Sequence, residues 1–264
     1  MGDFVTASGF EKTFAYGELF RHGLIITVLL AACTVFFGFF LGILLAMLRM
    51  SDVRPFRSLG LDRDGHLRGE GILLAVSRFN PIAFLATVYV EVIRSTPVIV
   101  QIFIVYHGVF GVLFDLPKFN VFGLDFIKFH RFFPGVVALA MNSGAYLCEI
   151  IRSGIQSVDG GQGEAARSLG LSRGQALRFI ILPQAIRNIL PAIGNEFVTI
   201  IKESAITYTI GVQDIMAAVE AVRGATWRIM EPLIVATLLY FCLCFPTSKI
   251  IAYFERRMSR GSKR

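Results

Sequence analysis

The residues of this chain that could do chemistry lie inside long apolar runs. In the run 81–114, Glu91 and Arg94 are three positions apart and are therefore neighbours on one face of a helix. An ionisable side chain at the centre of a membrane helix costs roughly 2.5 to 3.5 kcal/mol, so it is usually paired or lines a water-filled path. We expect these two residues either to form a structural ion pair that steadies the helix or to line a polar path.

A second group of polar residues stands in the apolar run 132–148. Asn142, Ser143 and Tyr146 supply donors and acceptors there, and Asn142 and Tyr146 are four positions apart on one face. Such residues either line a path or bind a neighbouring helix, where each hydrogen bond contributes about 0.6 kcal/mol on average. The residues themselves leave both roles open.

Other catalytic or metal-binding chemistry has no support in the sequence. The four cysteines all lie in apolar stretches, which predicts small hydrophobic side chains and neither a disulfide nor a zinc site. The four histidines are scattered and have no partners at metal-ligand spacing. The chain lacks the Gly-x-x-x-x-Gly-Lys-Ser/Thr loop that holds ATP phosphates, and no pairing of a nucleophile with a base is evident. We therefore expect no catalytic residue, no metal and no cofactor on this chain.

The composition indicates that a lipid bilayer surrounds most of this chain. Its 264 residues are 55% hydrophobic and only 17% charged, and the mean hydropathy of +0.64 is too high for an ordinary soluble domain. Because no water reaches the hydrocarbon core, a spanning backbone must satisfy its own hydrogen bonds, and long apolar runs therefore form helices. The expected fold class is an all-α membrane protein.

Five membrane-spanning helices are predicted within a membrane domain at 22–255. The first apolar run would be about 39 Å long as a helix, enough to cross a core of about 30 Å. In the second, Pro97 disfavours helical geometry at Thr96, so a kink or break is expected there. Gly38 and Gly42 either allow another helix to approach closely or are paired by chance. The predicted segments are an N-terminal segment at 1–21, spans at about 23–48, 81–114, 132–155, 184–203 and 229–254, a solvated loop at 49–78, an inner loop at 156–183, a return loop at 204–228 and a basic tail at 256–264.

The distribution of basic residues predicts which end of the chain faces the cytoplasm. If the N-terminus faces out, seventeen lysines and arginines fall in the inner loops and tail, against seven in the outer segments. The positive-inside rule therefore predicts a periplasmic N-terminus and a cytoplasmic C-terminus. The net charge of +7 follows from this topology, and binding to nucleic acid is not expected.

The inner loop contains the pattern of two short helices joined by a sharp corner. Good helix formers occupy 164–169, and Gly170 suits the C-terminal cap of this first helix. Ser172 and Gln175 then form the S-x-x-Q pattern that begins a second helix. From these helix rules alone, the segment is equally compatible with a plain amphipathic hairpin on the surface.

The spacing within this loop resembles the EAA loop of the permease subunits of ABC importers. The matching positions are Glu164-Ala165-Ala166, Gly170, Ile180 and Leu182-Pro183. Flanking segments are similar to the polar amino-acid branch of that family, the permeases of the histidine, glutamine and glutamate type. These segments are 89–101, 142–152 and 194–197, whereas 202–205 departs in detail from the usual residues.

The resemblance implies a type I ABC-importer permease fold and a set of site residues. In that family the helix of the EAA loop is a coupling helix that sits in a groove of the cytoplasmic ATPase. The coupling residues carried over to this chain are Glu164, Ala165, Ala166, Leu169 and Gly170. A substrate pathway is expected at Glu91, Arg94, Thr96, Gln101, Asn142, Ser143 and Tyr146, where the first two residues would sense the zwitterionic head of an amino acid.

The resemblance also implies a function, a location and a set of partners. The expected function is import of polar amino acids across the bacterial inner membrane, by a multi-pass permease that is not itself an enzyme. ATP and Mg²⁺ would bind to a dimer of ABC ATPase subunits, and the other expected partners are a second permease, identical or homologous, a periplasmic amino-acid-binding protein and the lipid bilayer. The alternatives from other classes are an ion-coupled secondary transporter or channel, which predicts an internal repeat that is not evident, and a membrane scaffold.

Overall fold

The computed structural model describes residues 5–53, 55, 76–114 and 116–260, and its regular structure is helical. The predicted loop at 49–78 lies largely outside the described residues. The short elements η2 and η4 are π-helical, and η3 and η5 are 3₁₀-helical. In chain order the elements are α1 (Ala7–Phe14), α2 (Gly17–Arg49), α4 (Pro81–Ser95), α5 (Val98–Phe103), η2 (Ile104–Phe110), η3 (Val121–Gly123), α6 (Phe129–Gln156), α7 (Gly160–Ser168), α8 (Arg173–Ala176), η4 (Leu177–Ile181), α9 (Leu182–Glu203), η5 (Ser204–Ile210), α10 (Ile215–Thr226) and α11 (Met230–Arg260).

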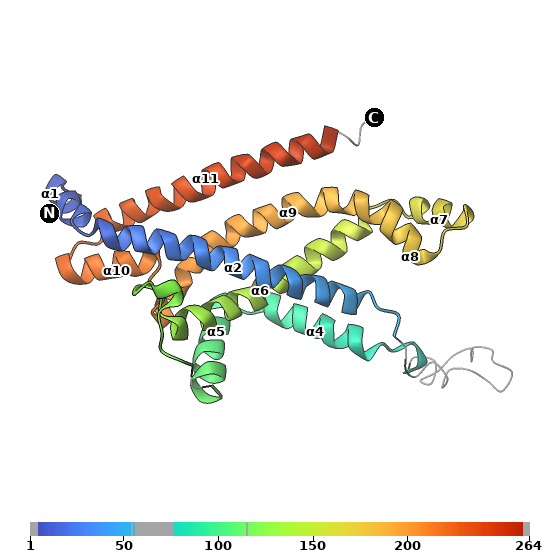
Figure 1. Ribbon diagram of the computed structural model, residues 1–264, viewed down its shortest axis with the longest axis horizontal. Coiled ribbons are helices and arrows are strands. Elements are labelled where there is room, and N and C mark those ends of the chain that lie inside the picture. The colour runs from blue at the N-terminus through green and yellow to red at the C-terminus, as the bar shows by residue number, and fades with distance from the viewer. Residues whose placement is uncertain (1–4, 54, 56–75, 115, 261–264) are drawn as a thin grey trace.

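The long helices α2, α6, α9 and α11 extend along the longest axis of the molecule (Figure 1). The α7–α8 hairpin and the end of α11 lie at one end of this axis, and α1 and α10 lie at the other. Four of the described helices are long and apolar enough to cross a membrane, and α4 with α5 makes a fifth span if this bent pair is counted as one. The predicted all-α membrane fold with about five spans is confirmed.

The break predicted in the second span is present. α4 ends at Ser95 and α5 begins at Val98, and the span is bent by 111° at the break between them. Thr96 between them is extended, with φ −112 and ψ 145, which is the geometry that the ring of Pro97 favours in the preceding residue. The chain therefore turns sharply within the bundle instead of crossing it as one straight helix.

The tight α2–α6 interface depends on glycine. A Cβ atom at Gly42 would lie 2.7 Å from the Cβ atom of Leu147 and 3.1 Å from the backbone nitrogen of Cys148. Gly38, one turn earlier, is similarly close to Ser143. The helices thus approach too closely for a side chain at Gly42, and at Gly38 a Cβ atom would crowd Ser143 at 3.2 Å. Of the two explanations open from sequence, the structure supports helix packing.

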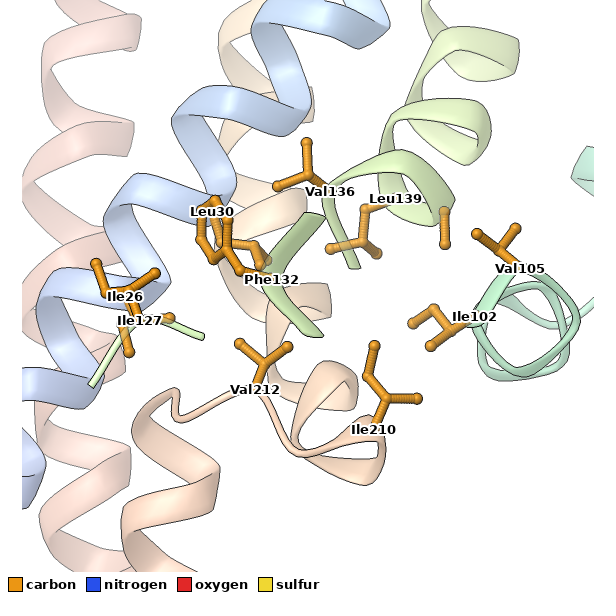
Figure 2. Close-up of a cluster of buried hydrophobic side chains, with 11 residues drawn as sticks. Ile26, Leu30, Ile102, Val105, Ile127, Phe132, Val136, Leu139, Ile210 and Val212 are labelled. Atoms are coloured by element: carbon orange, nitrogen blue, oxygen red, sulfur yellow. The ribbon is translucent and has the colours of Figure 1, made fainter. Parts of the chain in front are cut away.

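A buried apolar cluster holds α5 and η2 against the rest of the bundle. Figure 2 shows Leu30 of α2, Phe132 of α6 and Val212 converging in its centre, with Ile102 and Val105 of the bent span approaching from the opposite side. Leu30 and Ile102 are completely buried. This packing fixes the direction that the chain takes after the break at Thr96.

The segment predicted as a return loop, 204–228, is folded and packed. Its helix α10 buries Ile215, Val219 and Val222 in a cluster shared with residues of α2 and α11. Asp214 caps α10, because its side chain accepts a hydrogen bond of 2.9 Å from the backbone N–H of Ala217. The loop prediction was wrong here because α10 is too short to span a bilayer, and its apolar face instead covers the ends of longer helices.

The buried cap at Asp214 has a consequence for stability. Burial raises the pKa of this carboxyl to about 7 from its ordinary value of 3.8, although the backbone N–H of Ala217 acts in the opposite direction. The folded chain therefore binds the proton more tightly than the unfolded chain does. The resulting stabilisation is fully present below pH 3.8 and is lost as the pH rises through about 7.

We expect the free energy of unfolding to fall by about 1 kcal/mol from this group between about pH 6 and about pH 8. Asp214→Asn keeps an oxygen that can cap α10 but has no proton to lose in this range, so the variant should lack that part of the pH dependence. Thermal unfolding of both proteins in detergent at the two pH values measures the difference. Equal pH slopes for the two proteins would contradict the prediction.

The N-terminal helix α1 is fixed to the beginning of α11. Thr6 caps α1 by accepting a hydrogen bond of 3.0 Å from the backbone N–H of Gly9. The backbone N–H of Thr6 itself donates to Glu231 Oε1 at 3.2 Å, and Arg228 lies 3.4 Å from the same oxygen. Glu231 is only 1% exposed. The predicted N-terminal segment 1–21 thus contains a helix that packs against the last span.

Candidate functional site

The hairpin predicted in the inner loop is formed by α7 and α8. Asp159 caps α7 by accepting a hydrogen bond of 2.6 Å from the backbone N–H of Gly161. At the other end Gly170 has φ +85, the left-handed region that favours glycine. The backbone N–H of Leu171 donates to the carbonyl of Ala166 at 3.1 Å, which closes the helix as a glycine cap does. The predicted corner at Gly170 is confirmed.

The second arm of the hairpin begins with the predicted capping box. The backbone N–H of Gln175 donates to Ser172 Oγ at 3.3 Å, and the backbone N–H of Ser172 donates to Gln175 Oε1 at 2.8 Å. From α8 the chain continues through η4 into α9, where Pro183 lies in the first turn. Both arms are therefore set by local hydrogen bonds, and the second arm leads directly into a spanning helix.

The two faces of α7 differ in exposure. Glu164 and Ala165 are exposed, and Leu169 is 82% exposed although it is apolar. Ala166 is only 5% exposed, because this side of α7 packs against η4. Of the expected coupling residues, Ala166 is therefore turned away from the exposed surface, since one helical step places neighbouring residues on different faces. Ala165 and Leu169 form the exposed face.

A cluster of charged side chains lies where α2, α4 and α6 meet. Glu149 of α6 is at its centre and pairs with Arg49, the last residue of α2. Its Oε2 atom accepts two hydrogen bonds from Arg152, at 2.8 and 3.1 Å. Its Oε1 atom also lies 3.8 Å from Nη1 of Arg94 on α4. One carboxylate therefore holds three guanidinium groups, and we call these four residues the Glu149 cluster.

Arg94 takes a partner that was not predicted. Its guanidinium lies over the ring of Tyr146, 5.4 Å from the ring centroid, as well as beside Glu149. Glu91 is exposed, and the described residues include no ion pair between Glu91 and Arg94. Of the two roles left open from the sequence, the intrahelical ion pair is not formed, because Arg94 reaches across to a better-buried acid on α6.

Thr96 and Gln101 come together at the break in the second span. The side-chain amide of Gln101 donates to the carbonyl of Ile93 at 2.7 Å, to the carbonyl of Thr96 at 3.1 Å and to Thr96 Oγ1 at 2.9 Å. Gln101 is only 6% exposed. It thereby satisfies carbonyl groups that the break leaves without helical partners, so its evident role is to stabilise the bend.

The three polar residues of α6 do not share one environment. Asn142 and Ser143 are buried, and Asn142 Oδ1 has no hydrogen-bond partner within the described residues. Tyr146, which was expected to share a face with Asn142, is 38% exposed and lies under Arg94. Asn142 and Ser143 therefore lie inside the helix bundle, and Tyr146 lies at its edge.

Sequence reasoning missed three members of the Glu149 cluster. Arg49, Glu149 and Arg152 were not among the candidate residues, although Glu149 and Arg152 are three positions apart near the inner end of a predicted span. An acid and a base at this spacing on a membrane helix could have pointed to the cluster. Among the residues that the structure describes, no group of three or more histidine, cysteine, aspartate or glutamate side chains could hold a metal ion.

Comparison with known families identifies the class of protein to which this chain belongs. A family model described as "binding-protein-dependent transport system inner membrane component" matches residues 70–260. That range contains the bent second span, three members of the Glu149 cluster and the whole inner hairpin. The chain belongs to this permease family.

Relatives of the permease extend the match to nearly its whole length. The arginine transport system permease protein ArtQ of Bacillus subtilis (strain 168) is 35% identical over 249 residues, which cover 94% of this permease and 96% of the relative. A putative glutamine transport system permease protein, GlnP of Rickettsia typhi, is 37% identical over 191 residues, covering 71% and 82%. A solved structure, "Crystal structure of an amino acid ABC transporter with histidines", shares 38% identity and a TM-score of 0.76, covering 94% of this permease and 98% of that chain. The permease is therefore a multi-pass transport subunit of an ABC system and not an enzyme.

Proposed function

We propose that this permease imports polar amino acids across the bacterial inner membrane, driven by ATP hydrolysis on a separate dimer of ABC ATPase subunits. The observation that carries the proposal is the α7–α8 hairpin, which projects from one end of the bundle and turns its corner at Gly170, a residue in the left-handed region. Relatives named as arginine and glutamine permeases support the substrate class.

The exposed face of α7 is the proposed seat for the ATPase. Leu169 is an apolar side chain left 82% exposed, and Ala165 lies one turn before it. Small and apolar residues on one helical face suit insertion into a groove of a partner protein. Glu164, the other exposed member of the predicted set, would lie at the edge of this contact, while Ala166 and Gly170 give the hairpin its shape. ATP and Mg²⁺ bind to the partner in this proposal.

The proposed orientation places the hairpin in the cytoplasm and α1 in the periplasm. Both the end of α11 and the hairpin lie at one end of the molecule, and α1 lies at the other (Figure 1). We predict that single cysteines at Ser8 and Ser168, both exposed, label differently in a background without the native cysteines. An impermeant thiol reagent added to spheroplasts should modify the first and spare the second, and the reverse pattern would contradict the orientation.

A substrate pathway is proposed along the second span and α6. Glu91 is an exposed acid within a spanning helix, and such a group is costly against lipid unless it faces water or another protein chain. Arg94, Thr96, Gln101, Asn142, Ser143 and Tyr146 complete the proposed set, with Thr96 and Gln101 shaping the bend. We predict that Glu91→Ala lowers amino-acid uptake about tenfold at low substrate concentration, while the amount of inserted permease stays the same. Uptake equal to wild type would remove Glu91 from the pathway.

The remaining proposed partners are a second permease chain, a periplasmic amino-acid-binding protein and the bilayer. Large apolar side chains such as Phe241 and Phe245 of α11 remain 58% and 48% exposed in the single chain, which fits contact with lipid or with a second permease. The end of the molecule formed by α1 and α10 is the proposed side for the binding protein. A second copy of this chain and a homologous chain are both compatible with such a pairing.

One experiment tests the function as a whole. The tagged permease is purified from bacterial membranes, the co-purifying ATPase is identified, and the complex is reconstituted with its binding protein. Uptake of radiolabelled L-arginine and L-glutamine is then measured with and without ATP and Mg²⁺. We expect an ABC ATPase in the preparation and uptake that requires ATP. Uptake that needs only an ion gradient would instead indicate a secondary transporter and overturn the proposal.

A further inference from the structure

The Glu149 cluster connects the inner hairpin to the break in the second span. Glu149 lies seven residues, about two turns, before the end of α6 at Gln156. α7 begins at Gly160, directly beyond that end. On the other side Glu149 contacts Arg94, the last residue but one of α4 before the break at Thr96.

The Glu149 cluster holds its neighbouring helices with different strength, tightly at α2 and more loosely at α4. α2 and α6 are packed closely at Gly42, and Arg49 pairs with Glu149 across the same interface while only 11% exposed. Because close-packed helices move together, a shift of α7 that displaces the end of α6 would carry α2 with it. These two helices therefore form one body beside the hairpin.

The end of α4 is held more loosely. Nη1 of Arg94 is 3.8 Å from Glu149, whereas Arg152 approaches the same carboxylate to 2.8 Å, and the Arg94 side chain is 37% exposed. Arg94 also has a second site of attraction, because the face of the Tyr146 ring lies beneath its guanidinium. A shift of α6 can thus exchange one of these contacts for the other without leaving the arginine unpaired.

We infer that Glu149 is a positioning residue for transport, which transmits movement of the hairpin to the α4–α5 bend by holding or releasing Arg94. This inference rests on the proposed function, because it requires that the hairpin responds to an ATPase. Glu149 contacts neither ATP nor substrate in this role. It sets how much amino acid is moved for each ATP hydrolysed.

The test compares uptake with ATP hydrolysis in proteoliposomes that contain the complete complex. Glu149→Gln keeps the size of the side chain but removes the charge that holds the guanidinium groups. Arg94→Gln releases only α4 and leaves Arg49 and Arg152 on Glu149, so the variant is available if the first does not fold. We expect each to lower uptake per ATP hydrolysed by about tenfold, with hydrolysis continuing. In Glu149→Gln, whose residue lies outside the proposed substrate pathway, the half-saturating concentration of L-arginine or L-glutamine should stay unchanged. Arg94→Lys should recover part of the loss.

A matched control is available at the opposite end of the molecule. Glu220 and Arg223 of α10 form another pair three residues apart. Because α10 lies on the proposed side for the binding protein, the comparison is made at a saturating concentration of that protein, where Glu220→Gln should leave uptake per ATP unchanged. The inference is overturned if Glu149→Gln and Arg94→Gln couple as well as wild type. It is also overturned if uptake and hydrolysis fall in proportion, which indicates a role in folding alone, or if the half-saturating concentration rises in Glu149→Gln, which indicates that Glu149 contacts substrate.

A further variant separates this inference from the function on which it rests. Ala165→Trp enlarges the exposed face of α7 without touching the Glu149 cluster, and it should uncouple transport if the hairpin binds the ATPase. Normal coupling in Ala165→Trp would contradict the proposed function itself. Uncoupling in Ala165→Trp together with normal coupling in both cluster variants would overturn only the role of Glu149.

Discussion

Replacing Gly170 with valine should reduce amino-acid uptake by about tenfold, because a side chain in the left-handed region costs roughly 1 to 2 kcal/mol. Gly170 has φ +85, and a Cβ atom there would meet nothing within 4 Å. The expected effect therefore comes from the backbone alone, which would leave this conformation and turn the second arm of the hairpin away. The measurement is ATP-dependent uptake of L-arginine and L-glutamine together with substrate-stimulated ATP hydrolysis.

Two further variants show whether the shape of the hairpin is what matters. Gly174 lies in the same hairpin, has no positive φ and also has open space around it, so Gly174→Ala should leave both activities close to wild type. Ala166 is only 5% exposed between α7 and η4, so Ala166→Trp should uncouple transport as Gly170→Val does. Wild-type uptake and hydrolysis in Gly170→Val and Ala166→Trp would mean that the hairpin is not the coupling element.

Gly42→Ala should prevent most of the permease from folding, whereas the same substitution at Gly224 should not. A methyl group at Gly42 would lie 2.7 Å from Leu147 Cβ, and no flexible side-chain end is there to move aside. Such overpacking typically costs about 1 to 3 kcal/mol and sometimes more. At Gly224, where a Cβ atom meets nothing within 4 Å, alanine should instead stabilise α10 by up to about 1 kcal/mol.

Size-exclusion chromatography and thermal unfolding in detergent measure this contrast. The Gly42→Ala protein should elute mainly as aggregate or unfold at a lower temperature than wild type. The Gly224→Ala protein should elute normally and unfold at the same or a higher temperature. Similar behaviour of the two variants would show that the α2–α6 contact is less tight than the structure indicates.

The spanning helices could be predicted because the residues that determine each of them form one continuous apolar stretch of the sequence. The run that begins at Gly23 needs only its own length and hydropathy to be recognised, and the break at Thr96 needs only the proline that follows. α10 could not be recognised in the same way, since it has only 12 residues and is stabilised by burial of Val219 and Val222 against helices distant in the sequence. The spacing of its apolar residues indicates a buried helix face only once the helices that cover this face are known.

In the candidate site, too, the features set by neighbouring residues could be predicted and those set by distant contacts could not. The corner at Gly170 and the capping box at Ser172 were predictable because cap chemistry is local. The burial of Ala166 was not predictable, because it depends on which side of α7 packs against η4. The contact between Arg49 and Glu149 could not be predicted either, because the two residues lie 100 positions apart and nothing in either segment shows that they will meet.

The contact between Thr6 and Glu231 can form only late in the biosynthesis of the chain. Its two partners are 225 positions apart, so the ribosome needs roughly 10 to 45 seconds to reach the second after making the first, at about 5 to 20 residues per second. During that time the first turn of α1 lacks its carboxylate acceptor, and the earlier spans enter the membrane with α1 undocked. A nascent chain released before residue 231 lacks Glu231 and therefore cannot form this contact between α1 and α11.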